Sequence, residues 1–365
     1  MKINGTHYQS IWIQNDKVQV FDQRFFPHKT LLFDIENFED ACYAIKEMVV
    51  RGAPLIGVTA AYGMYLCLFE MNATDDFKQK IKVFAQRIKA TRPTAVNLAW
   101  AVDTLLAAIS KAASLSEAKA IALNKAEQLK NEDVSICEQI GNHGLEIIKA
   151  ISEAKKGKTV NMLTHCNAGW LATIDWGTAT APIYKAQENG IDVHVWVDET
   201  RPRNQGANLT AFELGQQGVK HTLIPDNTGG HLMQHGMVDV VIVGTDRVTR
   251  KGDVANKIGT YLKALAAKAN NIPFYVALPS STLDTEVVDG VKEIPIETRN
   301  ENEVKYIRGK YINEVVDVLI CPENTPAINY GFDVTPADLV TGFITERGIC
   351  EASEEGLKKL FPERF

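Results

Sequence analysis

The second half of the chain alternates short apolar segments with helix-like segments, and this alternation constrains the fold more than any other feature. The apolar segments are rich in Val and Ile, as expected for strands covered on both faces. They are residues 160–163, 193–197, 221–224, 238–243, 274–278 and 315–320. Helices fit between most of them, so the sequence predicts an α/β fold with a mostly parallel, Rossmann-like sheet.

Polar clusters, most of them containing Gly, follow five of these six predicted strands. The clusters are residues 164–169, 198–206, 225–231, 244–247 and 278–282. The carboxyl ends of parallel strands share one edge of a sheet, and open α/β sheets bind their ligands at that edge. The sequence therefore predicts a binding or catalytic site there.

Cys166 lies in the first cluster, Thr164-His-Cys-Asn-Ala-Gly169, where a predicted strand gives way to a predicted helix. The positive end of a helix dipole can lower the pKa of a thiol and make it reactive. A free cysteine is more often a small buried hydrophobe, and position alone does not exclude that reading. Four other polar clusters on the same edge favour a functional thiol.

Asp246 follows the apolar run that ends at Gly244. A carboxyl group in a dry setting has a raised pKa and is a plausible proton donor. The alternatives are a helix N-cap or an ion pair with Arg247. Pairing with Cys166 on another strand end favours the catalytic reading.

Three further motifs are candidate anion sites. Arg51-Gly-Ala-Pro places an arginine and free backbone N–H groups at a predicted helix N-terminus. Arg92 begins a similar arrangement, and Asn256-Lys257 precedes a third predicted helix. Surface salt bridges are the alternative for each motif.

The first half of the chain reads as short strands followed by helices. Alternating residues between 8 and 33 predict a few strands, with a hairpin turn near Asn15-Asp16. The predicted helices are residues 38–50, 53–70, 75–91, 94–113 and 116–154, the last with irregularities at Asp133 and at Gly141-Asn142. Pro93 is expected in the first turn of its helix, where proline is tolerated. The polar segment 153–158 suggests a boundary, so we expect a helical domain with a short β-sheet at 1–154 and a catalytic domain at 155–365.

The composition and the motifs argue against several classes of protein. The net charge of −6 gives no general case for nucleic-acid binding. Six cysteines without a CxxC pair fit a reducing compartment. No signal peptide and no run of about 18 apolar residues is recognised, so we expect a cytoplasmic protein without a membrane partner. No dinucleotide, ATP or His-based metal motif occurs, and we predict neither a cofactor nor a metal.

A thiol, a carboxylate and several cationic anchors suit proton or hydride movement within one small phosphorylated, hydroxyl-rich molecule. These ingredients suit redox chemistry or phosphoryl transfer poorly. The residues by themselves carry the prediction no further.

The chain resembles the methylthioribose-1-phosphate isomerases of methionine salvage over about residues 8–350. These isomerases share a superfamily with the regulatory subunits of the translation initiation exchange factor. The resemblance is carried by Arg51-Gly-Ala-Pro, Arg92-Pro-Thr-Ala-Val-Asn97, Thr164-His-Cys-Asn-Ala-Gly169, Glu199-Thr-Arg-Pro, Gln205-Gly-Ala, Gly244-Thr-Asp-Arg and Gly252-Asp-Val-Ala-Asn-Lys-Ile-Gly-Thr-Tyr261.

The resemblance implies an aldose–ketose isomerase that converts 5-methylthioribose 1-phosphate into 5-methylthioribulose 1-phosphate. Asp246 would protonate the ring oxygen, and Cys166 would act while hydrogen moves between C2 and C1, as a proton or as a hydride. The residues implied to hold the phosphate and hydroxyls are Arg51, Gly52, Ala53, Arg92, Gln205, Asn256 and Lys257. The family also implies a homodimer and an apolar pocket for the methylthio group, whose residues the sequence does not identify.

The chain departs from the family pattern at a few positions, including Asn208 where Arg is expected and Thr245 before Asp246. None of the departures removes a residue assigned to chemistry. They leave open a sibling isomerase for 5-deoxyribose 1-phosphate or ribose 1,5-bisphosphate. A non-catalytic regulatory subunit that binds a sugar phosphate or nucleotide is the alternative from another class.

Overall fold

The computed structural model describes residues 1–15, 17–72, 76–92 and 96–365. Its N-terminal part contains β1 (Lys2–Ile3), β2 (Thr6–His7), β3 (Ile11–Gln14), β4 (Lys17–Phe21), β5 (Leu32–Ile35), α1 (Phe38–Lys46), α2 (Ala53–Leu66), η1 (Cys67–Glu70), α3 (Phe77–Lys89), α4 (Val96–Ile109) and α5 (Leu115–Ala154). The expected strands and helices are present, and β3, β4 and β5 form an antiparallel sheet. Three predictions lie outside the described residues. They are the hairpin turn at Asp16, the helix start at Asp75, and the helix start at residues 93–95 with the role of Pro93.

Helix α2 is the centre of the N-terminal core. All of its residues except Pro54 and Tyr65 are buried, and it packs against α1, α4 and α5. A helix that is apolar on every side needs such an enclosure. The stretch Ala53–Glu70 is long and apolar enough to cross a membrane, which the sequence reading missed, but 78% of it is buried inside the protein.

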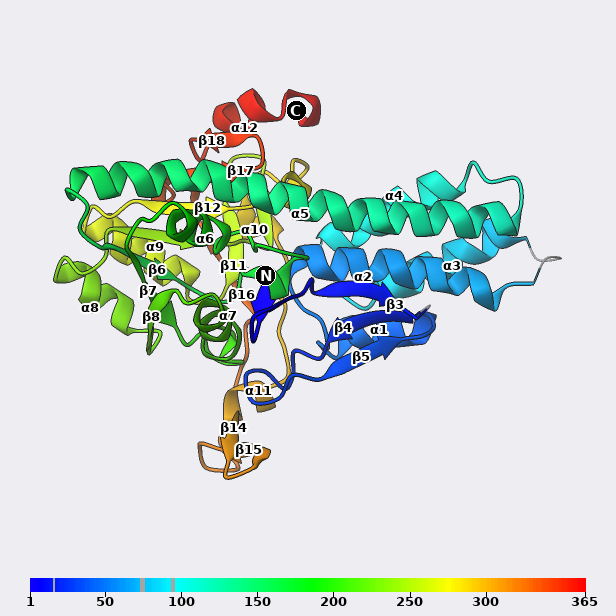
Figure 1. Ribbon diagram of the computed structural model, residues 1–365, viewed down its shortest axis with the longest axis horizontal. Helices are drawn as coiled ribbons and strands as arrows, with labels where there is room; N and C mark the ends of the chain where they lie inside the picture. The colour runs from blue at the N-terminus through cyan, green and yellow to red at the C-terminus, as the bar shows by residue number, and fades with distance from the viewer. Residues whose placement is uncertain (16, 73–75, 93–95) are drawn as a thin grey trace.

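Helix α5 is 40 residues long and runs along the whole molecule (Figure 1). Ala122 and Leu129 in its first half join the N-terminal core, whereas Ile140 and Ile148 join a core against the large sheet. The irregularities expected at Asp133 and Gly141 were wrong, because the helix is continuous. A Cβ on Gly141 would lie 3.0 Å from Ala181, so this glycine permits close packing of the next helix.

The large sheet has seven strands in the order β18-β17-β12-β9-β6-β7-β8. They are β6 (Val160–Thr164), β7 (Val193–Asp198), β8 (Lys220–Ile224), β9 (Val240–Val243), β12 (Phe274–Ala277), β17 (Gly342–Thr345) and β18 (Gly348–Cys350). All neighbours are parallel except β17 and β18. The expected mostly parallel sheet is confirmed.

Helices cover both faces of this sheet. The remaining helices are η2 (Trp170–Ala172), α6 (Ala181–Glu188), η3 (Gly206–Thr210), α7 (Ala211–Gln216), α8 (Thr228–Gln234), α9 (Thr260–Ala269), η4 (Ser280–Thr282), α10 (Gly290–Glu293), α11 (Asn302–Lys305), η5 (Ala337–Leu339), α12 (Glu354–Leu360) and η6 (Pro362–Arg364). Residues of α5, α6 and α7 form the core on one face, and residues of α8, α9 and α12 form the core on the other.

A smaller sheet follows β9, with the strand order β13-β10-β11-β16. Its strands are β10 (Arg247–Thr249), β11 (Val254–Lys257), β13 (Leu283–Asp284) and β16 (Phe332–Thr335). Because β10 begins directly after Asp246, this sheet is built onto the carboxyl edge of the large one.

The segment 315–320 corrects the predicted topology. It forms β15 (Glu314–Leu319), which pairs with β14 (Tyr306–Tyr311) in an antiparallel hairpin and, among the described residues, with no other strand. We call residues 306–319 the arm, because they project from the body of the molecule (Figure 1). Its apolar run resembles a buried strand in sequence, but most of β15 is exposed. The parallel strand at that side of the sheet is β17 instead.

Candidate active site

The strand order of the large sheet reverses between β6 and β9, which are neighbours although β7 and β8 separate them in sequence. Ligands of open α/β sheets bind in the crevice at such a reversal. Cys166 follows β6 and Asp246 follows β9. The topology therefore brings the two candidate catalytic residues to one point of the carboxyl edge.

Cys166 is buried in a tight turn with a φ of 67°. Its backbone N–H donates to Thr200 Oγ1 at 2.8 Å, and its carbonyl accepts from Thr210 Oγ1 at 2.7 Å. The helix-dipole expectation for Cys166 was wrong, because the short η2 follows the turn and the next α-helix begins at Ala181. Burial raises the pKa of the Cys166 thiol, while the charges of Arg51 and Lys257 act to lower it.

Glu213 holds this turn in place through hydrogen bonds. Its carboxylate accepts hydrogen bonds of 3.0 Å from Asn167 Nδ2 and from the backbone N–H groups of Trp170 and Leu171. Burial raises its pKa to about 7. A Cβ on Gly169 would lie 1.6 Å from Glu213 Oε2, so the turn requires glycine at that position.

Arg51 is held on the same turn. Its guanidinium donates to the side-chain and backbone oxygens of Asn167, the latter at 2.8 Å. Gly52 caps the N-terminus of α2 with a φ of 95°, and a Cβ there would lie 2.3 Å from the Ala172 carbonyl oxygen. The backbone N–H groups of Ala53 and Leu55, in the first turn of α2, have no acceptor within the helix, whereas Pro54 has no N–H. An anion site at this helix N-terminus stays a prediction.

Asp246 stands at the junction of the two sheets, where its backbone N–H donates to the Ala255 carbonyl at 3.0 Å. Burial raises the pKa of its carboxyl group, and Lys257, Arg92 and Arg51 oppose that effect. Arg247 pairs instead with Asp284 at 3.4 Å, and β10 rather than a helix follows Asp246.

Asn256 and Lys257 lie at the end of β11, not in a helix opening, because α9 begins only at Thr260. The Lys257 ammonium donates to the Gly331 carbonyl at 3.0 Å and lies 4.9 Å from the Phe332 ring centre. Burial lowers the pKa of Lys257, which Cys166 and Asp246 counteract. Asn256 donates to Thr260 Oγ1 at 3.0 Å.

Several buried polar atoms of this region have no hydrogen-bond partner among the described residues. They include Arg92 Nε, Asn97 Oδ1, Gln205 Oε1 and Glu297 Oε2. A buried polar atom without a partner is costly unless a ligand or water completes it. Arg92 and Gln205, both expected at the site, thus offer unused donors and acceptors to a ligand.

Two cavities flank the Arg51–Ala53 turn. The larger, about 710 Å³, is lined by Arg51 and Gln205 together with Arg203 and Arg299. The smaller, about 40 Å³, contains Asp246, Arg92, Gly52 and Ala53, with a wall formed by Ile56, Ile294, Pro295 and Phe332. The small cavity matters more for chemistry because it holds the candidate acid.

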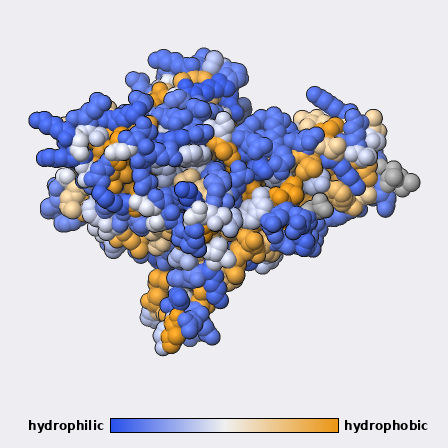
Figure 2. Space-filling view, in the orientation of Figure 1, coloured by the Kyte–Doolittle hydropathy of each residue, from blue (hydrophilic) through white to orange (hydrophobic). Residues whose placement is uncertain are grey.

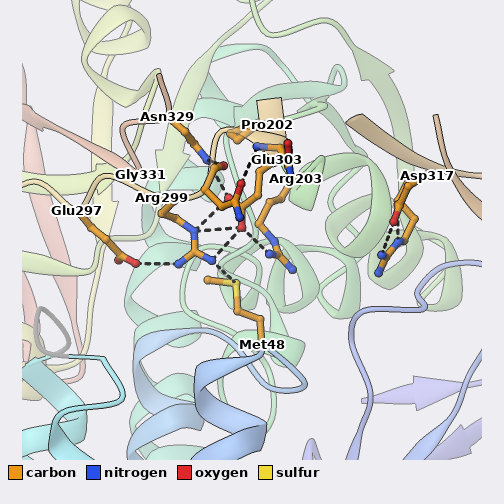
Figure 3. A network of polar contacts seen from close by, with 12 residues as sticks. Met48, Pro202, Arg203, Glu297, Arg299, Glu303, Asp317, Asn329 and Gly331 are labelled. Carbon is orange, nitrogen blue, oxygen red and sulfur yellow. Dashed lines mark hydrogen bonds and ion pairs between the residues drawn. The ribbon is translucent and has the colours of Figure 1, made fainter. Parts of the chain in front are cut away.

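Sequence reasoning missed the segment 294–303, which we call the strap. Ile294 and Pro295 line the small cavity, and Arg299 and Glu303 line the large one. Its Glu297 and Arg299 belong to a polar network that includes Arg203 and Met48 (Figure 3). The strap follows no sheet strand, so the rule that located the other residues could not find it.

His165 joins a second buried network beside Cys166. Its ring nitrogens lie 2.8 Å from Asp198 Oδ2 and 2.9 Å from the Ile258 carbonyl. His165, Asp198 and Asp226 could together hold a metal ion by geometry. The ammonium of Lys263 lies 3.1 Å from Asp198 Oδ2 and already supplies a cation. The absence of a metal therefore stays a prediction.

Comparisons with known proteins agree on one family. A model described as the initiation factor 2 subunit family matches residues 49–352. Methylthioribose-1-phosphate isomerases from Paramagnetospirillum magneticum and Desulfatibacillum aliphaticivorans are 59% and 56% identical, and each alignment covers 100% of both chains.

Solved structures give the same relationship. The crystal structure of 5-methylthioribose 1-phosphate isomerase from Pyrococcus horikoshii matches with a TM-score of 0.84 and 36% identity over 100% of both chains. A structure described as the delta subunit of translation initiation factor eIF-2B from A. fulgidus matches with a TM-score of 0.80 and 38% identity, over 98% of this chain and 100% of that one.

Proposed function

We propose that this chain, which belongs to the methylthioribose-1-phosphate isomerase family, converts 5-methylthio-D-ribose 1-phosphate into 5-methylthio-D-ribulose 1-phosphate in methionine salvage. The observation that carries the proposal is the buried pair of Cys166 and Asp246 at the strand-order reversal. Cationic Arg51 and Lys257 act on both residues. A binding module would have no need for this thiol and acid.

The first chemical step is ring opening. The phosphate on the anomeric oxygen prevents the sugar from opening as a free aldose does. Asp246, with its raised pKa, donates its proton to the ring oxygen while the bond from C1 to that oxygen breaks. The ring oxygen becomes the C4 hydroxyl, and positive charge develops at C1.

Hydrogen then moves from C2 to C1. A neutral thiol is a poor base, and burial raises the pKa of Cys166, so the site favours transfer of a hydride over removal of a proton by a thiolate. The hydride neutralises C1, the C2 hydroxyl becomes the ketone, and its proton returns to the Asp246 carboxylate. Cys166 then forms part of the dry wall beside the migrating hydrogen.

Isotope labelling separates the two routes. Turnover in D₂O by the hydride route leaves C1 of the ketose free of solvent deuterium. Substantial deuterium at C1, measured by NMR, would instead establish the proton route, in which a base removes the C2 proton and a cis-phosphoenolate forms.

The phosphate and hydroxyl anchors in the proposal are Arg51, Gly52, Ala53, Arg92, Gln205, Asn256 and Lys257. The unpartnered Arg92 Nε and Gln205 Oε1 support their part in binding, within the residues that the structure describes. The small cavity, of about 40 Å³, contains Arg92, Gly52 and Ala53 of this set together with Asp246.

The apolar wall beside Asp246 supports a methylthio group at C5. Ile56, Ile294 and Phe332 line that wall, although Arg92 and Arg247 line other parts of the same cavity. The wall therefore supports an apolar C5 substituent, and kinetics on ribose 1,5-bisphosphate decide whether these arginines also accept a second phosphate.

Side-by-side kinetics on the three 1-phosphates test the proposed function. We expect methylthioribose 1-phosphate to have the highest kcat/KM, and Asp246→Asn to lose at least about a hundredfold in turnover, as for loss of a proton-transfer group. Cys166→Ala should also lower turnover, and a loss as large as that of Asp246→Asn would favour the proton route with Cys166 as base. Circular dichroism should show both variants folded. Binding without turnover of any of the three sugars would favour a regulatory role instead.

We further propose that the protein is cytoplasmic and forms a homodimer. In each subunit, residues 1–154 would form a helical domain and residues 155–365 a Rossmann-like catalytic domain. The arm supports association, because Tyr311 is 69% exposed and Ile312 is 74% exposed and its projecting surface carries apolar patches (Figure 2). Light scattering of the wild type and of the Tyr311→Ser, Ile312→Ser variant tests this proposal. A wild-type monomer at micromolar concentration would contradict it.

A further inference from the structure

Glu297 is held at the centre of the strap. Its Oε1 accepts from Arg299 Nη1 at 2.7 Å, and its backbone carbonyl accepts from the Gly331 N–H at 2.8 Å (Figure 3). These contacts anchor the residue at its backbone and at one carboxylate oxygen. They leave the other carboxylate oxygen for a different partner.

That second oxygen faces Arg92. Glu297 Oε2 lies 3.8 Å from Arg92 Nη2, and among the described residues it has no hydrogen bond although it is buried. Arg92 Nε is buried and equally without a partner there. The pair is therefore close enough to interact electrostatically but leaves Arg92 donors available to a ligand.

The charges around Asp246 are unbalanced without this carboxylate. Lys257, Arg92 and Arg51 all favour the ionised form of Asp246, and Glu297 is the acidic group that opposes them. Cys166, the other titratable neighbour, is a neutral thiol when its pKa is raised. Three cations suit phosphate binding, but they work against an acid that must retain its proton until the ring opens.

We propose that Glu297 is a positioning residue that reconciles these demands: its carboxylate offsets the cation cluster next to Asp246 and leaves the Arg92 donors available to the phosphate. The inference rests on the proposed function, in which Asp246 is the proton donor. Glu297 contacts neither the reacting atoms nor Asp246 directly, so it acts through Arg92 and through its charge.

The neighbouring Glu303 provides the matched control. It also accepts from Arg299, at 2.9 Å, and it pairs with Arg203 at 2.8 Å. Glu303→Gln therefore disturbs the same strap and the same arginine. It does not change the charge next to Arg92, on which the carboxylates of Glu297 and Asp246 act.

The test compares the pH dependence of kcat for wild type, Glu297→Gln, Glu297→Asp and Glu303→Gln. A general acid loses activity as pH rises through its pKa. Removing the Glu297 charge should move this alkaline limb to lower pH, because Glu297 favours the protonated form of Asp246. We expect no rise in KM, since Arg92 loses a competitor for the phosphate. In Glu297→Asp, which keeps the charge, the alkaline limb of kcat should lie at the wild-type pH. In Glu303→Gln the alkaline limb should also lie at the wild-type pH.

An unmoved alkaline limb in Glu297→Gln would overturn the inference, as would a loss of kcat at every pH accompanied by a higher KM. A shift of equal size in Glu303→Gln would also overturn it, because it would indicate a general disturbance of the strap.

A second measurement does not depend on turnover. The infrared band of the protonated Asp246 carboxyl, assigned by its loss in Asp246→Asn, should disappear at lower pH in Glu297→Gln than in the wild type. If the wild type fails to isomerise the sugar but this band still shifts, the proposed function fails while the electrostatic role of Glu297 stands. If the enzyme is active but the band does not shift, the inference alone fails.

Discussion

Glu213, which accepts hydrogen bonds from the turn that follows Cys166, makes the stability of the protein depend on pH in a direction unusual for a carboxylate. Burial raises its pKa from 4.5 to about 7. The folded protein therefore holds a proton on this group between these pH values, where the unfolded chain has lost it. The stabilisation is fully present below pH 4.5 and is lost as pH rises through about 7.

The perturbation that tests this reasoning is Glu213→Gln, which removes the titration. The wild-type contribution to the free energy of unfolding should fall by about 2–3 kcal/mol between about pH 5 and pH 8. The amide also leaves at least one of three buried N–H donors without an acceptor, at a cost of about 1–3 kcal/mol that does not depend on pH. The stability advantage of the wild type should therefore shrink steadily as pH rises.

Urea unfolding followed by tryptophan fluorescence at pH 5, 6, 7 and 8 measures the difference. Glu303→Gln is the control: burial acts to raise the pKa of Glu303, but Arg299 and Arg203 lower it to about 2, so its titration lies outside this range. A wild-type advantage over Glu213→Gln that stays constant, or grows as pH rises, would refute the reasoning.

Three other predictions concern the site. Gly52→Ala should lower the stability of the protein by at least about 1–3 kcal/mol, the cost of the left-handed backbone alone, because the new Cβ would also lie 2.3 Å from the Ala172 oxygen; a thermal melt within 1 °C of wild type would contradict this. Treatment with EDTA should leave isomerase activity unchanged, whereas activity lost on chelation and restored by a divalent ion would assign a metal to His165 and its neighbours. Ile294→Arg should place a cation in the apolar wall and raise the kcat/KM ratio of ribose 1,5-bisphosphate to methylthioribose 1-phosphate by about tenfold or more; an unchanged ratio would remove Ile294 from the C5 pocket.

Much of the fold followed from local patterns. Apolar runs rich in Val predicted five of the parallel strands, and long amphipathic or Ala-rich stretches predicted α1 to α5, because strand and helix periodicity are properties of neighbouring residues. The apolar run 315–320 was wrongly predicted to be a strand of the parallel sheet for the same reason. Burial of an apolar strand depends on what packs against it, and here almost nothing covers β15.

The candidate site likewise has some residues that local sequence patterns predicted and some features that they did not. Residues directly after sheet strands, such as Cys166 and Asp246, were predicted because strand ends of a parallel sheet necessarily meet at one edge. The role expected for a helix dipole at Cys166 was wrong, because it depended on a helix that the chain does not form there.

The sequence by itself thus determined which elements form and which side chains reach the carboxyl edge of the sheet. Only the tertiary structure decided which charges surround them. Glu297 is 51 residues beyond Asp246 and Arg92 is 154 residues before it in the chain, yet both act on its carboxyl group. Electrostatic interactions depend on distance in space and on burial, neither of which a linear pattern specifies.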